Sequence, residues 1–253
     1  MQYFYVDDTS IRVLRINHRA LVGLFVSDTG NLFDRVASLR LKHAVPPYSE
    51  LKSAVALLHN ADGFLEDLAS LINTCSRTTF MVISSNNNSD HIASLLLDAL
   101  GRYCRSNNLP AYYLLADEGI VRAQLERRLL AGEWPECIGV QSLRSKYDFG
   151  IQLADWTATL MKSYINAVLS RAVGQVLVTD SGQPVWIDFN SLVQFALRYR
   201  WWGDVLTPTG EEVISIEQQP FLHILGRSII IDSSPEVRDA LEPICKVFMG
   251  CIH

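Results

Sequence analysis

Three aspartates occupy positions from which they could act together. Asp7 closes an aromatic and β-branched run, QYFYVD, that is typical of a strand over 2–7. Asp117 closes a second such run, YYLLAD, and Asp155 lies in IQLADW, near the start of a segment with helical period. Ligand sites of open α/β sheets collect beyond the carboxyl ends of the strands, so we expect these carboxylates to share one edge of a sheet.

Carboxylates that are brought together repel each other, and burying them without a counter-charge is costly. A divalent cation resolves that problem. Hard oxygen ligands with few histidines favour Mg²⁺ or Mn²⁺ over zinc, and two such ions can hold the attacking and leaving oxygens of a phosphodiester. The pattern therefore predicts a Mg²⁺ or Mn²⁺ site that hydrolyses phosphate esters.

Each aspartate also has a simpler role. An aspartate at a strand end is usually a turn former or a helix cap, and the segment Asp117–Gly119 suits that role. Asp155 lies among apolar residues, where Lys162 or Arg144 could pair with it in a structural ion pair. Asp8 points to the opposite face of the first strand, where it would contact solvent or a turn.

The elements that must position these residues alternate as in an α/β domain. Strands are predicted at 2–7, 20–27, 78–85, 111–117 and 136–144, and helices at 30–42, 48–60, 61–75, 90–106, 118–132 and 149–170. The first two strands suggest a hairpin with a turn between Ile11 and Arg19. From residue 78 onward strands and helices alternate, which favours parallel strands with right-handed crossovers. The predicted fold is α/β, with a mixed sheet flanked by helices.

The last part of the chain is less regular. A hairpin is predicted at 175–189, a helix at 190–202, a strand at 228–233 and a closing helix at 235–250. We interpret 1–172 as the main domain and 173–253 as a C-terminal α+β extension. The extension is rich in apolar and aromatic residues, which is compatible with a homo-oligomer.

The extension also carries an aromatic and basic cluster, RYRWWGD, formed by Arg198, Arg200, Trp201 and Trp202. Such clusters can stack nucleic-acid bases and bind phosphates. A place in the core of the extension or in a protein interface is the simpler interpretation.

Composition limits the class of protein. Of 253 residues, 49% are hydrophobic and 19% are charged, which suits a folded protein with a real core. The net charge of −5 gives no overall basic field, so nucleic-acid contact would need a local basic patch or a metal ion. The five cysteines lack CxxC spacing, the chain begins without the features of a signal peptide, and no apolar run approaches the ~20 residues of a membrane span. We expect a cytoplasmic protein with no membrane contact.

Three motifs resemble a known family. They are YVDDTS at 5–10, ADEG at 116–119 and SKYDFGIQLAD at 145–155, the last being the most specific. The chain resembles the large prokaryotic family catalogued as domain of unknown function 3800, which is similar to the ribonuclease H-like superfamily. The resemblance covers roughly residues 1–170. Where that family has Asp-Glu-Ser-Gly at the end of its first strand, this chain has Asp-Asp-Thr-Ser.

The resemblance implies a ribonuclease H-like fold with Asp7 on the first strand, Asp117 on the central parallel strand and Asp155 on the final helix. It also implies metal-dependent cleavage of DNA or RNA, with Mg²⁺ or Mn²⁺ held by the three aspartates. Glu50, in a Glu-Leu-Lys segment like one found in the family, would be a fourth carboxylate.

Two residues of the third motif could assist. Lys146 could neutralise developing charge or hold a phosphate, or be a surface lysine. Gln152 shares a helix face with Asp155 and could orient a ligand carboxylate or a metal-bound water, or be a surface amide.

Three functions remain open from the sequence. The first is a metal-dependent nuclease, the second a non-catalytic ribonuclease H-like module that binds a protein or nucleic acid, and the third a metal-dependent phosphohydrolase acting on a small nucleotide. The net charge counts mildly against the first and for the third.

Overall fold

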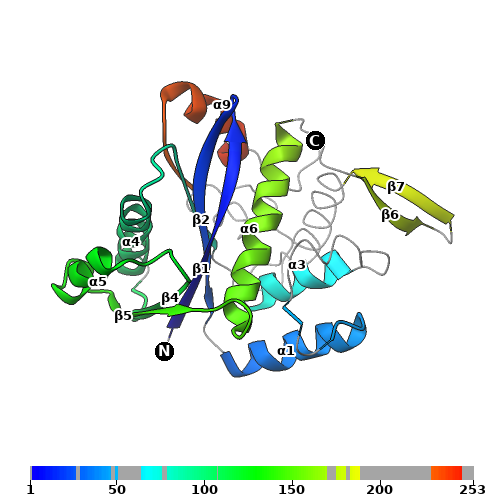
Figure 1. Cartoon of the computed structure of the whole chain (residues 1–253), viewed down its shortest axis with the longest axis horizontal. Coiled ribbons are helices and arrows are strands. Elements are labelled where there is room, and N and C mark those ends of the chain that lie inside the picture. Colours follow the sequence, from blue (N-terminus) through cyan, green and yellow to red (C-terminus); the bar gives the residue numbers. More distant parts are fainter. Residues whose placement is uncertain are drawn as a thin grey trace.

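The computed structural model describes residues 2–26, 29–46, 49–50, 64–75, 79–106, 108–169, 175–180, 183–188 and 229–246. The described residues form a six-stranded mixed sheet with helices on both faces, and a separate two-stranded hairpin (Figure 1). The strands of the main sheet are β1 (Gln2–Val13), β2 (Ile16–Val26), β3 (Thr79–Ser84), β4 (Tyr112–Asp117), β5 (Cys137–Leu143) and β8 (Ile229–Asp232). The helices are α1 (Thr29–Lys42), α3 (Phe64–Cys75), α4 (Ser89–Ser106), α5 (Ala123–Leu130), α6 (Phe149–Val168) and α9 (Pro235–Lys246).

The strand order of the main sheet is β5-β4-β1-β2-β3-β8. Strands β1, β4 and β5 pair in parallel, as do β3 and β8, whereas β2 is antiparallel to both β1 and β3. In the described sheet, β2 is thus the one strand that runs against the others. The predicted α/β class and mixed sheet are confirmed, and the ribonuclease H-like fold stays a prediction.

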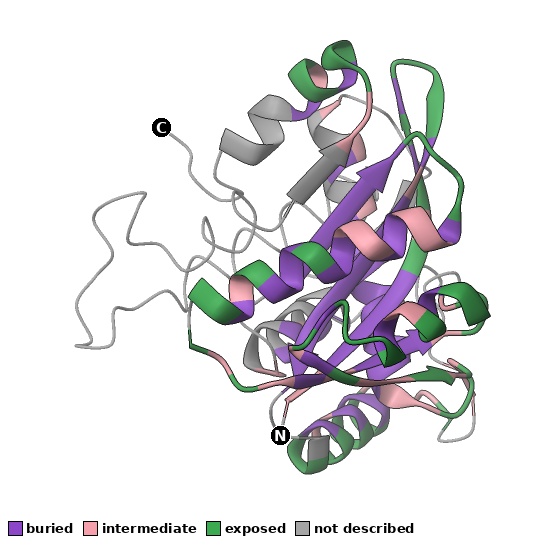
Figure 2. Cartoon of the chain, turned by 90° about the vertical axis from the view of Figure 1, so that its left-hand side faces the viewer, coloured by how far each residue is buried: buried purple, intermediate pink, exposed green. Residues whose placement is uncertain are grey.

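Side chains of β1 alternate between two cores. Tyr5 packs in the core that lies under α1, α3 and α6, while Phe4 and Val6 pack in the core under α4 and α5. The central strands are buried from both sides, as Figure 2 shows. This alternation decides which helix each polar side chain of β1 faces.

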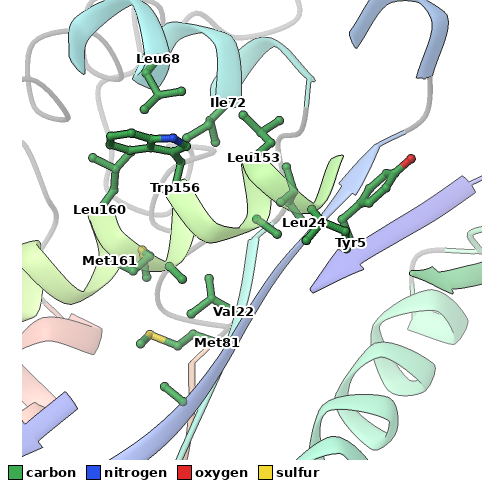
Figure 3. Close-up of a cluster of buried hydrophobic side chains, with 14 of the residues drawn as sticks. Tyr5, Val22, Leu24, Leu68, Ile72, Met81, Leu153, Trp156, Leu160 and Met161 are labelled. Atoms are coloured by element: carbon green, nitrogen blue, oxygen red, sulfur yellow. The ribbon is translucent and has the colours of Figure 1, made fainter. Parts of the chain in front are cut away.

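Helix α6 is the main support of the first core. Its side chain Trp156 is fully buried and lies between α3, which contributes Leu68 and Ile72, and the sheet (Figure 3). The helix covers Phe149–Val168, close to the predicted range of 149–170. The predicted helices at 30–42, 61–75 and 90–106 are confirmed as α1, α3 and α4.

The first hairpin differs from the prediction. Strand β1 continues to Val13 and β2 begins at Ile16, so Ile11 and Arg19 are strand residues and the turn is Leu14–Arg15. Both turn residues have positive φ, 47° and 68°, in the left-handed region that glycine or asparagine usually occupies. The turn contains neither glycine nor asparagine, so the sequence does not mark it. The predicted end of the first strand was therefore too early.

The predicted helix at 118–132 is also too long. Helix α5 covers Ala123–Leu130, and the chain from 118 to 122 forms a turn in which Gly119 has a φ of +89°. An amide in that turn, Ile120 N, donates to the main-chain oxygen of Asp117 at 3.3 Å.

The C-terminal part contributes to the main sheet. Strand β8 extends it beside β3, and Val237 and Leu241 of α9 are buried in the first core. The predicted hairpin is present as β6 (Gln175–Asp180) and β7 (Gln183–Asp188), which stand away from the main sheet in Figure 1.

The predicted helices at 48–60 and 190–202 lie outside the described residues, apart from residues 49–50. A domain boundary at residue 172 stays a prediction. None of the helices in the described part of the chain is long and apolar enough to cross a membrane.

Candidate acidic site

Asp7 and Asp117 lie side by side on neighbouring parallel strands. The pairing of β1 with β4 ends at Val6 opposite Ala116, so these aspartates are the next residue on each strand. Asp117 ends β4 as predicted, whereas Asp7 is the first residue beyond the parallel pairing and not the end of β1. The prediction of a strand end at Asp7 was wrong because β1 goes on to pair with β2 alone.

Both aspartates face α6. Tyr5 and Leu115 precede them by two residues, and both belong to the core that contains the α6 residues Ile151 and Trp156. Side chains two apart on a strand share a face, so the carboxylates point toward the same helix. Asp7 is buried, with 7% of its surface exposed.

The second turn of α6 brings Asp155 to this face. Asp148 caps the helix, because its Oδ1 accepts a hydrogen bond from the Ile151 amide at 3.0 Å. Asp155 is half-buried. Its negative charge and that of Asp117 are among the causes that raise the pKa of Asp7, so Asp7 lies within electrostatic reach of both other predicted aspartates.

Burial and like charges disfavour ionisation at this site. Burial, followed by the charges of Asp155 and Asp117, raises the pKa of Asp7 to about 7, although the Asp8 amide, 2.6 Å from Oδ1, works in the opposite direction. Burial also raises the pKa of Asp117, against the amides of Glu118 and Ser145. With a pKa of about 7, the Asp7 carboxyl is partly protonated near neutral pH.

Glu50 is connected to the site through Ser145. The Ser145 hydroxyl donates a hydrogen bond to Glu50 Oε1, and the Ser145 amide donates to Asp117 Oδ1 at 3.3 Å. The fourth carboxylate suggested by the resemblance is thus placed two hydrogen bonds from Asp117.

Sequence reasoning missed Arg40, on α1. This arginine is 4% exposed, and its Nη2 donates to Gln152 Oε1 at 2.8 Å. Gln152 is buried and not a surface amide. A signal was available, since Arg40 lies four residues after Val36 on the apolar stripe of the predicted helix, where a charged side chain needs buried acceptors.

Other predicted residues lie elsewhere. Lys146 is exposed, with its amine 5.5 Å from the centre of the Tyr147 ring. Arg144 pairs with Glu118 at 2.7 Å, so its hydrogen bond goes to a glutamate and not to Asp155. The predicted nucleic-acid residues Arg198, Arg200, Trp201 and Trp202 lie outside the described residues.

Asp8 points to the opposite face, as predicted. It pairs with Arg19 at 2.8 Å, and Arg19 also bonds to Ser89 at the start of α4. The two adjacent aspartates of the first strand therefore serve different faces of the sheet.

The acidic site fits a hard divalent cation by its chemistry. Its donors are carboxylate oxygens, and the raised pKa of Asp7 reflects first its burial and then the negative charges of Asp155 and Asp117, which a cation would offset. Among the described residues, however, no three acidic, histidine or cysteine side chains are arranged as a complete metal site.

Comparisons with known proteins leave the family open. No protein-family model matches the chain, and no curated protein matches it. Among solved structures, the PCNA:RNase HII complex from Archaeoglobus fulgidus contains a chain to which this one is similar, with a TM-score of 0.39 and 15% sequence identity, covering 85% of this chain and 95% of that chain. A likeness at that level does not assign a function to this chain. Membership of the family that the motifs suggest stays a prediction.

Proposed function

We propose that this protein is a divalent-metal-dependent nuclease that hydrolyses phosphodiester bonds in DNA or RNA. The supporting observation is the convergence of Asp7, Asp117 and Asp155 on the α6 face, where burial and two neighbouring carboxylates raise the pKa of Asp7. A structural ion pair would lower that pKa instead, as at Asp67, whose pKa is lowered by Lys42 and His43.

Different residues of the chain would bind the metal and the substrate. Asp7, Asp117 and Asp155 would hold one or two Mg²⁺ or Mn²⁺ ions, with Glu50 as a further acidic group. When bound, such an ion would supply an activated water and neutralise charge on the phosphate. The exposed amine of Lys146 would bind a phosphate of the substrate.

Metal binding provides the first test. Calorimetry with MnCl₂ is expected to show binding to the wild type and its loss in Asp7→Asn and Asp155→Asn. Asp8→Asn is the control, because it removes an adjacent charge that is paired with Arg19 on the opposite face, and it is expected to change the affinity much less than either site variant. If the wild type binds no Mn²⁺, even with nucleic acid present, the proposal of a metal-dependent nuclease fails.

Substrate class is a second test. Labelled single-stranded and double-stranded DNA and RNA, with free nucleotides as competitors, are incubated with wild-type protein and Mg²⁺. Cleavage of a polymer that is lost in Asp7→Asn supports the nuclease. Hydrolysis of free nucleotides alone would favour a small-nucleotide phosphohydrolase, and binding without cleavage would favour a non-catalytic module.

A further inference from the structure

Four hydrogen-bonded segments form a closed ring beside the acidic site. Arg40 Nη1 donates to the main-chain oxygen of Ser49 at 2.8 Å, and the next residue, Glu50, accepts from the Ser145 hydroxyl. The main-chain oxygen of Ser145 accepts from Gln152 Nε2 at 2.7 Å, and Gln152 Oε1 accepts from Arg40 Nη2 at 2.8 Å. The ring joins α1, the segment that carries Glu50, the loop before α6, and α6 itself.

Arg40 suits its place in this ring because a guanidinium donates in several fixed directions. Its Nη1 also bonds to the main-chain oxygen of Pro46 at 2.8 Å, and the guanidinium lies 5.1 Å from the centre of the Phe149 ring. A lysine would present one compact ammonium group and could not reproduce that fork. Arg40 therefore holds the main chain at Pro46 and at Ser49 on one side and the side chain of Gln152 on the other.

Gln152 uses both its amide oxygen and its amide nitrogen in the ring. Arg40 can only donate, so the amide oxygen must face it, and the amide nitrogen is left to donate to the Ser145 carbonyl. Neither a carboxylate nor an apolar side chain can do both. The side chain is buried, so a lost bond would not be replaced freely by water.

The ring contacts two of the acidic groups through Ser145. Its hydroxyl donates to Glu50, and its amide donates to Asp117. We propose that Arg40 and Gln152 are positioning residues that hold the Ser145 loop and thereby aim the carboxylates of Asp117 and Glu50 at the cation. This inference rests on the proposed metal-dependent function. Neither residue touches the reacting phosphate; each acts through Ser145.

Two variants of Gln152 test the inference. Gln152→Glu keeps the acceptor for Arg40 but removes the donor to Ser145, and Gln152→Met removes both without adding charge. Gln141→Glu, at an exposed position of β5, is the matched control for the added charge. Each protein is titrated with MnCl₂, and exchange of the Ser145 amide is measured by NMR in ion-free protein.

Both Gln152 variants are expected to bind Mn²⁺ on the order of 10–100-fold more weakly, while Gln141→Glu, which adds a charge without changing the ring, binds no more weakly than the wild type. The added negative charge of Gln152→Glu would by itself strengthen cation binding, so a weaker affinity must come from lost positioning. The Ser145 amide is expected to exchange faster in both variants, and their thermal midpoints are expected to stay well above the temperature of the titration.

Unchanged Ser145 exchange in both variants overturns the inference. Faster exchange with an unchanged Mn²⁺ affinity in both variants also overturns it, because the loop would then not set the carboxylates. A wild-type protein that binds no Mn²⁺ instead contradicts the proposed function. Ser145 exchange then decides separately whether the ring holds the loop.

Discussion

Gly150 lies directly against the ring of Tyr5, so that a β carbon at residue 150 would come within 2.1 Å of Tyr5 Cε1. The first turn of α6 therefore packs directly on the Tyr5 ring of β1, with no helix side chain at residue 150 between them. Asp7 follows Tyr5 by two residues on the same face, and Asp155 lies on the same helix as Gly150. The close approach of helix and strand is what brings the two acidic groups within electrostatic reach.

Gly150→Ala is expected to separate α6 from β1. The variant should lose about 1–3 kcal/mol of unfolding free energy through overpacking, and it should bind Mn²⁺ more weakly because Asp155 moves away from Asp7. Urea unfolding and MnCl₂ calorimetry measure the two effects. In Gly132→Ala, the control, the added β carbon meets no atom within 4 Å, but the φ of +79° costs about 1 kcal/mol. A Gly150→Ala protein with wild-type stability and affinity would contradict the account of α6 packing.

Asp7→Asn should change how stability depends on pH in ion-free protein. The folded-state pKa of Asp7 is about 7 and its ordinary value is 3.8, so between these values the folded protein keeps a proton that the unfolded chain has released. Raising the pH through that window therefore destabilises the wild type, by on the order of 2–4 kcal/mol. Asparagine stays neutral and removes this contribution.

Urea unfolding in EDTA at pH 4, 5, 6, 7 and 8 checks this expectation. The difference in stability between Asp7→Asn and the wild type should grow in favour of the variant as pH rises and level off above pH 7. Parallel curves for the two proteins would mean that Asp7 titrates normally and that burial and neighbouring carboxylates do not act on it.

The turn Leu14–Arg15 can be stabilised without touching the acidic site. Both residues have positive φ, and Leu14 is 51% exposed, so little packing is lost on substitution. The double substitution Leu14→Asn and Arg15→Gly supplies the pair preferred in this kind of turn and should add about 1 kcal/mol of stability. The thermal midpoint should rise while Mn²⁺ affinity stays constant. A lower midpoint would show that the turn residues make contacts that outweigh their backbone strain.

Asp232 ties β8 to the rest of the sheet. Its Oδ2 accepts hydrogen bonds from the Ser84 hydroxyl at 2.6 Å and from His91 Nε2 at 2.8 Å, and both interactions lower its pKa. A lowered folded-state pKa gives stability above the unfolded value of about 3.9 that is lost as pH falls through the folded value. Because the side chain is 36% exposed, solvent screening limits the effect to about 1 kcal/mol or less.

Asp232→Asn should therefore be slightly less stable than the wild type at pH 7, with the difference vanishing near pH 2. Chemical unfolding at both pH values makes the comparison. Amide exchange in β8 should also be faster in the variant at pH 7. Equal stability at both pH values would indicate that main-chain pairing with β3 alone fixes β8.

The class of fold and the positions of the candidate acidic residues on their strands and helix could be predicted from the sequence. Hydrophobic period separates strands from helices wherever one face is buried, and this holds for the long elements from β3 to α6. Asp117 and Asp155 were located correctly because local pattern is enough to mark the end of a buried strand and the first turns of a buried helix. The same reasoning placed Asp8 on the opposite face from Asp7.

The contacts and hydrogen bonds between these residues, by contrast, depend on the tertiary structure. The length of β1 depends on its partner β2, because the two strands stay paired as far as Val13. The turn that follows contains no glycine, so the local sequence does not mark where the strand ends. The raised pKa of Asp7 depends on strand register and on the approach of α6, and the ring through Arg40, Gln152 and Ser145 joins residues that are 7 to 112 positions apart. Register, burial and long-range hydrogen bonds are properties of contacts between elements, and the period of one segment does not encode them.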